Sequence, residues 1–257
     1  KDCLSPDRII IGADDPRTAM LLQYLYAPVN APVFVTTMTT AEMIKYASNA
    51  VLATKISLAN EIGNFCKKLG IDSREVFSAV GMDSRINPAF FQTGIGFGGS
   101  CFPKDVRALI AGARLHGENL KILKAVLDVN EEQPKKLLFL LQRHIPNLQG
   151  KTIGVLGLSF KPDTDDIRES RAIPVIADLL AGGARVVAYD PVAMDNFRRI
   201  FPQIAYASRP DEVLTSDAVL IVTEWREFEK LDFHGKIVID GRRNDKARAE
   251  AAIYEGV

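Results

Sequence analysis

The 257-residue chain has 47% hydrophobic and 25% charged residues and a formal net charge of +0, the composition of an ordinary globular protein. A neutral chain favours neither nucleic acid nor an anionic membrane as a partner, so any anion site has to be local. No run of about 18 apolar residues is present to span a bilayer, and an odd number of cysteines, 3, argues against a disulfide framework. We therefore expect a cytoplasmic protein.

The N-terminal segment predicts a strand at residues 8–12, a helix at 16–26 and a second strand at 33–36. These elements are too short to enclose a core, so we interpret residues 1–37 as the remnant of another domain. The chain begins with Lys1 rather than Met and has no signal-peptide pattern, which suggests a part of a longer polypeptide.

A long helix is predicted from about residue 40 to residue 69. Thr39 and Glu42 have the spacing of a capping box at its start, and Gly70 is suited to end it. Its length of about 45 Å, from 1.5 Å per residue, exceeds what a small domain needs. We therefore expect a homodimer formed along this helix and leave further assembly open.

Two further regions follow, with the boundary at Gly150. Helices are predicted at 74–80, from Pro103, and at 120–144, where Pro134 opens or kinks the second half. After Gly150, strands at 152–158, 185–189, 218–223 and 236–240 alternate with helices at 172–180 and 193–200. The fold class is α/β: an all-helical central dimerisation domain (38–149) followed by a Rossmann-like parallel α/β C-terminal domain (150–257).

The segment 94–105 is the strongest candidate site. Its glycines allow the backbone to approach a ligand closely, and Pro103 is favoured in the first turn of a helix. Cys101 is thereby predicted just before a helix N-terminus, where the dipole and Lys104 favour the reactive thiolate. The alternatives are that Cys101 is a small packed residue and that Asp105 is a simple first-turn acid. Cys3 and Cys66 are interpreted as structural.

Other polar residues form weaker candidates. Lys45 and Asn49 have i, i+4 spacing and could direct a cation and an amide at one oxygen, although solvated surface residues have the same spacing. The loop at 154–170 lacks a complete G-x-G-x-x-G, so Lys161 and Arg168, with Arg242 and Arg243, are predicted to bind a diphosphate or else to pair with neighbouring acids. The three histidines have neither metal nor triad spacing, so no metal is expected.

Taken in order, the loop at 96–105, the Lys45/Asn49 helix, the loop at 159–170 and the turn at 240–242 resemble the UDP-glucose/GDP-mannose dehydrogenase family, and most closely its UDP-glucose 6-dehydrogenase branch. The resemblance covers nearly the whole chain. It implies an N-terminal NAD-binding domain, a central helical dimerisation domain and a C-terminal nucleotide-sugar domain. The chain resembles the last two with a remnant of the first.

The resemblance also implies the chemistry, a double oxidation of a sugar C6 alcohol to a carboxylate with two NAD. Cys101 would form a thiohemiacetal and then a thioester, Lys45 and Asn49 would stabilise the oxyanion, and Asp105 would activate or orient water. Of the remaining matched positions, the substrate-binding ones are Phe97, Gly98, Phe160, Lys161, Arg242 and Arg85, of which Arg85 would reach the substrate of the neighbouring subunit. The positions on the cofactor side are Lys104 and Arg168.

One departure from the family is that the N-terminal glycine fingerprint for NAD, with the glutamate and threonine supplied there, is absent from this sequence. We therefore expect the chain alone to be unable to turn over. The alternatives are a GDP-mannose or other nucleotide-sugar dehydrogenase and, from another class, a non-catalytic nucleotide-binding module.

Overall fold

A computed structural model describes residues 4–257 and divides the chain into two compact units, the first ending at Val51 and the second running from Leu52 to Val257. Cys3, interpreted above as structural, lies outside the described residues. The domain boundaries at 38 and 150 stay predictions. Among the helices of residues 4–257, none combines the length and the apolar character needed to cross a bilayer.

The first unit is a β-α-β arrangement. Strand β1 (Ile9–Gly12) pairs in parallel with β2 (Val33–Thr36), and helix α1 (Pro16–Tyr26) followed by the 3-10 turn η1 (Ala27–Val29) connects them. Asp15 caps α1 by accepting a hydrogen bond from the Thr18 N–H at 2.9 Å. The three elements predicted at 8–12, 16–26 and 33–36 are confirmed.

Helix α2 (Met38–Lys68) follows and has clear end signals. The capping box predicted at Thr39 is wrong, because α2 begins earlier and Thr37 Oγ1 accepts from the Thr40 N–H at 3.3 Å. The end at Gly70 is confirmed. Gly70 has a φ of 71°, and the next N–H, from Ile71, donates to the Cys66 carbonyl at 3.0 Å, which satisfies a carbonyl of the last turn.

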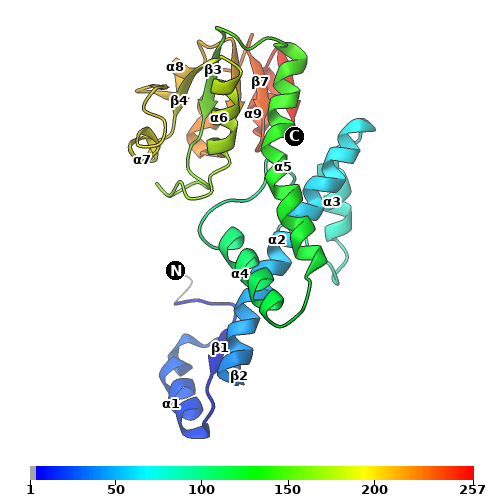
Figure 1. Cartoon of the computed structure of the whole chain (residues 1–257), viewed down its shortest axis with the longest axis vertical. Coiled ribbons are helices and arrows are strands. Elements are labelled where there is room, and N and C mark those ends of the chain that lie inside the picture. The colour runs from blue at the N-terminus through cyan, green and yellow to red at the C-terminus, as the bar shows by residue number, and fades with distance from the viewer. Residues whose placement is uncertain (1–3) are drawn as a thin grey trace. The chain divides into compact units, whose positions relative to one another are not determined.

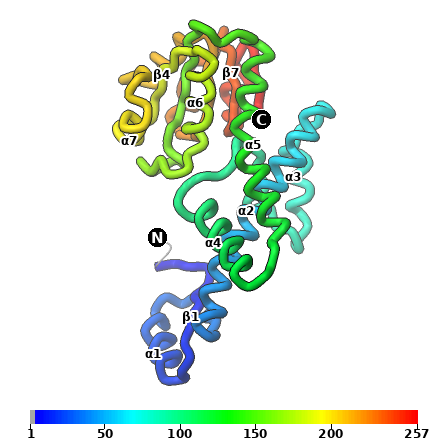
Figure 2. The backbone as a smooth tube through the Cα atoms, viewed as in Figure 1, coloured from blue at the N-terminus to red at the C-terminus, as the bar shows by residue number. Residues whose placement is uncertain are grey.

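The helical part of the second unit continues with α3 (Ser73–Gly81), α4 (Phe102–Leu115) and α5 (Lys121–His144). Residues 82–101, between α3 and α4, form neither helix nor strand (Figure 2). Pro134 lies inside α5 and does not start a separate helix. Since proline has no N–H, the carbonyl of Asn130, four residues earlier, lacks its usual helical donor.

The remainder forms a six-stranded parallel sheet in the order β5-β4-β3-β6-β7-β8. Its strands are β3 (Thr152–Leu156), β4 (Arg185–Tyr189), β5 (Ala205–Tyr206), β6 (Ala218–Ile221), β7 (Ile237–Asp240) and β8 (Ile253–Gly256). The connecting elements are α6 (Ala172–Ala181), α7 (Met194–Arg198), α8 (Pro210–Val213), η2 (Arg226–Lys230) and α9 (Asp245–Glu250). The third-second-first-fourth-fifth-sixth order is that of a Rossmann sheet, so the predicted α/β fold with a helical region is confirmed.

The sheet has a core on each face. On one face α6 and the second half of α5 lie side by side and contribute Leu137, Leu141 and Val175 (Figure 1), and on the other Phe228 and Phe233 are buried. The order in which successive strands are added to the sheet reverses between the parallel neighbours β3 and β6, so their carboxyl ends frame a crevice of the kind in which open α/β sheets bind ligands.

Candidate active site

Cys101 is the N-terminal capping residue of α4 and has an exposed, free thiol. Its side chain makes no capping hydrogen bond, and Ser100 Oγ lies 3.8 Å from the sulfur. The first N–H groups of a helix carry partial positive charge, which favours an anion at this position. The predicted placement of Cys101 just before a helix is confirmed, and its exposure contradicts the alternative of a packed residue.

Asp105 occupies the first turn of α4. Its N–H donates to the Cys101 carbonyl at 2.9 Å, so the two residues lie one helical turn apart. The Asp105 side chain is fully buried and forms an ion pair with Lys104, whose side chain is 63% exposed. A buried carboxylate in contact with a cation is more than a solvated first-turn acid.

The loop after β3 meets the cysteine loop at Gly99. A Cβ atom at Gly99 would lie 2.6 Å from the Phe160 ring, and Gly99 has a φ of 80°, so both space and conformation require glycine. Lys161 is exposed, and its Nζ lies 5.6 Å from the centre of the Phe160 ring. The structure thus brings the second predicted phosphate loop to the cysteine loop.

Arg168 lies beside Cys101. Its carbonyl accepts from the Gly99 N–H at 2.8 Å, and its exposed guanidinium donates to Asp166 at 2.6 and 3.0 Å. Hydrogen bonds to Asp166 are the main reason that the Arg168 pKa is raised, and the nearby Cys101 adds to it electrostatically. Pairing with a neighbouring acid, the alternative considered from the sequence, is therefore correct for Arg168 alongside its proximity to the thiol.

Asp190, at the carboxyl end of β4, fills the turn that follows β3. Its Oδ2 accepts from the N–H groups of Leu158 and Ser159 at 2.8 and 3.0 Å and from Trp225 Nε1 at 3.0 Å. In a dinucleotide-binding Rossmann domain such N–H groups face phosphate. Here a buried side chain occupies them, which agrees with the incomplete glycine pattern of this loop.

The spacing G-x-G-x-x-G does occur at Gly94, Gly96 and Gly99. It is no dinucleotide fingerprint, because the fingerprint requires a strand directly before the glycines and residues 82–93 form none.

Arg242 follows β7 and contacts both the segment after β6 and the cysteine loop. Its Nε donates to the Val222 carbonyl at 2.8 Å and pairs with Glu224 at 3.3 Å, while its terminal nitrogen lies 3.4 Å from the Gly96 carbonyl. With Gly94, Glu224 and Asn60 it lines a cavity of about 70 Å³. The buried Asn60 Nδ2 has no hydrogen-bond partner among residues 4–257, and sequence alone gave no signal for it.

Phe97 and Gly98 are held inside the fold. The Phe97 ring is buried beside Val106 and Ile110 and contacts Phe102 edge to face with centroids 5.8 Å apart. A Cβ atom at Gly98 would lie 2.2 Å from the Glu169 carbonyl oxygen. These contacts position the loop, and a role of either residue in substrate binding stays a prediction.

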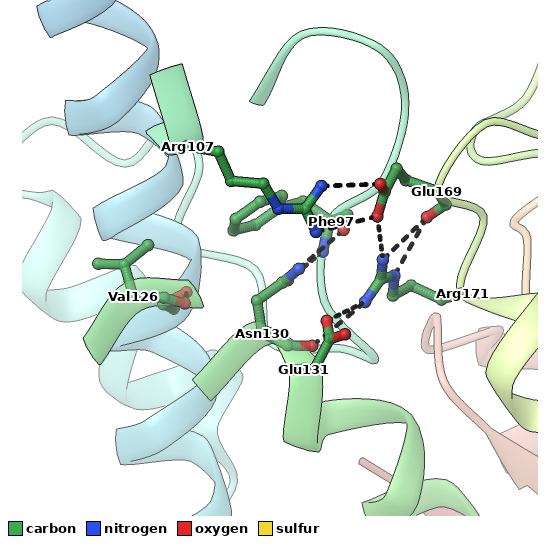
Figure 3. A network of polar contacts seen from close by, with 8 residues as sticks. Phe97, Arg107, Val126, Asn130, Glu131, Glu169 and Arg171 are labelled. Atoms are coloured by element: carbon green, nitrogen blue, oxygen red, sulfur yellow. Dashed lines mark hydrogen bonds and ion pairs between the residues drawn. The ribbon is translucent and has the colours of Figure 1, made fainter. Parts of the chain in front are cut away.

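A polar network missed by the sequence interpretation surrounds this loop (Figure 3). It comprises Asn130 and Glu131 of α5, Arg107 of α4, and Glu169 and Arg171 before α6. The only sequence signal was that Asn130 and Gln133 are polar, have i, i+3 spacing and lie four residues and one residue before Pro134 in an amphipathic helix.

The other predicted residues lie elsewhere. Lys45 and Asn49 are one turn apart on α2 within the first compact unit, whereas Cys101 belongs to the second. Lys45 Nζ lies 4.8 Å from the centre of the Tyr46 ring. Arg85 follows α3, is exposed, and donates to Asp83 at 2.6 Å. The joint action of these residues with Cys101 stays a prediction.

Comparison with known proteins identifies the relatives of the chain. A UDP-glucose 6-dehydrogenase of Haloferax volcanii, AglM, is 50% identical over 267 residues, covering 100% of this chain and 62% of the relative. A UDP-glucose 6-dehydrogenase of Bacillus subtilis, YwqF, is 42% identical, covering 100% of this chain and 61% of the relative. The chain therefore spans about three fifths of the length of these relatives.

A solved structure described as a UDP-glucose dehydrogenase from Pyrobaculum islandicum superposes with a TM-score of 0.96 at 49% identity, covering 99% of this chain and 59% of that one. Two models of one family match consecutive parts of the sequence: its central domain at residues 39–132 and its UDP binding domain at residues 154–245. The chain belongs to the UDP-glucose/GDP-mannose dehydrogenase family.

Proposed function

We propose that this chain carries the covalent-catalysis and nucleotide-sugar-binding part of an NAD-dependent UDP-glucose 6-dehydrogenase. The observation that carries the proposal is an exposed thiol, Cys101, at a helix N-terminus, preceded by a loop that meets Phe160 and Arg168 at Gly99. Relatives at 50% and 42% identity are named as UDP-glucose 6-dehydrogenases, which supports the proposed reaction and substrate.

In the proposed reaction the C6 alcohol is oxidised to an aldehyde, and the Cys101 thiolate attacks this carbonyl to give a thiohemiacetal. Oxidation of that species yields a thioester, and water then displaces the thiol to release the carboxylate. Each oxidation removes a hydride, which NAD accepts. The helix N-terminus at Cys101 supports the thiolate both as nucleophile and as leaving group.

Three residues of the chain are assigned to the charge and proton changes. Lys45 and Asn49, one turn apart on α2, donate to the oxyanion that forms at C6. Asp105 is buried one turn from Cys101 and paired with Lys104, so its carboxylate is fixed where it orients or activates the hydrolytic water.

Substrate binding is assigned to the edge of the sheet. Arg242 and Asn60 line the same cavity, and the Arg242 guanidinium suits a phosphate. Phe160 and Lys161 are assigned to the same ligand, the lysine supplying an exposed positive charge. Phe97 and Gly98 contribute by shaping the loop, and Arg85 is exposed, as a residue reaching a neighbouring subunit must be.

The positive charges beside Cys101 suit an anionic dinucleotide such as NAD. Lys104 and Arg168 are exposed cations that flank Cys101, and we assign them to NAD. The turn after β3 does not suit NAD, because its N–H groups already donate to the Asp190 carboxylate. We therefore infer that most NAD contacts come from outside these 257 residues and that the chain alone does not turn over.

A homodimer along α2 is the proposed assembly. Leu58, Ile62, Phe65 and Leu69 have helical spacing and are all exposed, with Phe65 at 61%. Such an apolar stripe is costly in water and is covered in a dimer. A Phe65→Glu variant should shift the sedimentation mass from dimer to monomer, while Lys68→Glu, on the same helix, should not; a monomeric unmodified chain would contradict the proposal.

The test of the function is NADH release by the full-length protein with UDP-glucose, GDP-mannose and N-acetylated UDP-sugars. UDP-glucose should be preferred, and Cys101→Ser should abolish the double oxidation. Preference for another nucleotide sugar would place the chain elsewhere in the family. No NADH with any of them would favour a binding module. Within the described part of the chain Cys66 and Cys101 are both free thiols, which supports the cytoplasm as the compartment.

A further inference from the structure

We propose that Asn130 is a positioning residue for Cys101, acting through the glycine-rich loop, and that Arg171 braces the opposite side of that loop. The inference rests on the proposed function, because a nucleophile has to be held in one geometry to react efficiently. It concerns residues that the sequence motifs of the family resemblance did not include.

Asn130 binds the loop as a neighbouring β-strand would. Its Oδ1 accepts from the Phe97 N–H at 2.7 Å, and its Nδ2 donates to the Phe97 carbonyl at 3.0 Å (Figure 3). One turn further along α5, Gln133 Nε2 donates to the Gly94 carbonyl at 2.7 Å. Both carboxamides are almost fully buried, at 3% and 1% exposure.

The loop is shaped to receive this side chain. Gly96 has a φ of 92°, and a Cβ atom there would lie 2.5 Å from Asn130 Oδ1. Residues 82–101 form no strand that could satisfy the main chain, and glycines give the segment high conformational freedom. A buried carboxamide that engages both polar groups of Phe97 therefore restricts the conformations available to Cys101, four residues later.

Arg171 holds the opposite side. Its side chain is only 6% exposed and donates to the Glu169 carbonyl at 3.1 Å, next to the Arg168 carbonyl that binds the Gly99 N–H. It also lies 3.4 Å from the Asn130 carbonyl, the one that Pro134 leaves without a helical donor. Glu169 in turn accepts from Arg107 of α4, the helix that Cys101 caps, at 2.8 Å.

These contacts join the three elements around the thiol. Helix α5 holds the first half of the loop, the segment at 168–169 holds the second, and Arg107 ties α4 to that segment. The orientation of the Cys101 thiol relative to the α4 N-terminus and to Arg168 is thereby fixed before substrate binds. A single truncation at Asn130 removes two of these bonds at once.

The test is the rate at which 2,2′-dithiodipyridine labels Cys101 in the 257-residue chain, followed by mass spectrometry of its peptide. Asn130→Ala should slow labelling about tenfold, the effect of one to two buried hydrogen bonds. The control Gln142→Ala changes an exposed carboxamide of the same helix and should have no effect. Labelling of the buried Cys66 reports unfolding.

Asn130→Asp provides a readout that general loosening would not give. A protonated carboxyl can accept from the Phe97 N–H and donate to its carbonyl, whereas a carboxylate can only accept. The rate relative to the unmodified chain should therefore recover as pH falls towards about 4, while that of Asn130→Ala should not. If Asn130→Ala does not fold, this recovery alone decides.

Unchanged Cys101 labelling in a folded Asn130→Ala variant, or no pH-dependent recovery in Asn130→Asp, would overturn the inference. Slow labelling of Cys101 in the unmodified chain, equal to that of Cys66, would instead contradict the proposed nucleophile. The two failures are therefore distinguishable.

Discussion

The loop before Cys101 and the turn after β3 are both glycine-containing segments with main-chain N–H groups, but the fold fills them differently. The turn after β3 surrounds the Asp190 carboxylate, which accepts from Leu158 and Ser159 at 2.8 and 3.0 Å. The loop before Cys101 is held by an uncharged carboxamide, Asn130, and leaves its thiol exposed. The Asp190 carboxylate thus occupies the N–H groups of one segment, whereas the uncharged Asn130 side chain leaves the thiol that follows the other accessible.

Removal of the thiol tests the loop before Cys101 and has the largest expected effect. In the full-length protein, Cys101→Ser should lower kcat for carboxylate formation by about 10³-fold or more, because covalent catalysis is lost. Cys66→Ala, at the other free thiol among residues 4–257, should leave kcat nearly unchanged. Full double oxidation by Cys101→Ser, measured as NADH released per UDP-glucose, would contradict the assignment.

Removal of the Asp190 carboxylate tests the turn after β3. Asp190→Ala leaves several donors unpaired, including the buried Leu158 and Ala193 N–H groups and the partly buried Trp225 Nε1, so the free energy of unfolding should fall by about 3 kcal/mol. Urea denaturation followed by fluorescence measures it. Asp195→Ala, an exposed acid of α7, should cost below about 1 kcal/mol. Equal losses would remove the distinction between the two segments.

Lysine residues at the two ends of β3 provide a further comparison. Lys161 follows the carboxyl end of β3, where ligands bind in parallel sheets, and Lys151 precedes its amino end. Lys161→Ala should weaken UDP-glucose binding about tenfold, or ~1.4 kcal/mol. Lys151→Ala should not change the affinity measured by calorimetry. Equal weakening by both variants would mean a non-specific charge effect.

The smallest effect is expected at the Arg107–Glu169 pair, which links α4 to the segment beside the loop before Cys101. The Arg107 hydrogen bond holds the Glu169 pKa below its usual 4.5, so the ionised carboxylate stabilises the fold. That stabilisation is complete above pH 4.5 and is lost as pH falls through the lowered pKa. Arg107→Ala should reduce the acid-induced loss of stability by below about 1 kcal/mol, seen in thermal unfolding at several pH values. An unchanged acid limb would contradict this.

Several elements followed from the sequence because their signals are local. The helix at 16–26 and the strands at 33–36 and 185–189 have the predicted bounds, and Gly70 ends α2 as expected. The placement of Cys101 before a helix needed only the glycines and Pro103. The short strand β5 and the terminal strand β8 were missed, because pairing with neighbouring strands, rather than their own composition, defines them.

Sequence alone therefore determined the α/β class, the order of most elements and, through resemblance, the family to which the chain belongs. Only the tertiary structure decided which side chains, Asn130 and Asp190, bind the main chain of the two glycine-containing segments. Asn130 lies 33 residues from Phe97 and Asp190 lies 32 residues from Leu158. Such bonds depend on which helix or strand packs against a loop, and neither propensity nor periodicity within a short window carries that information.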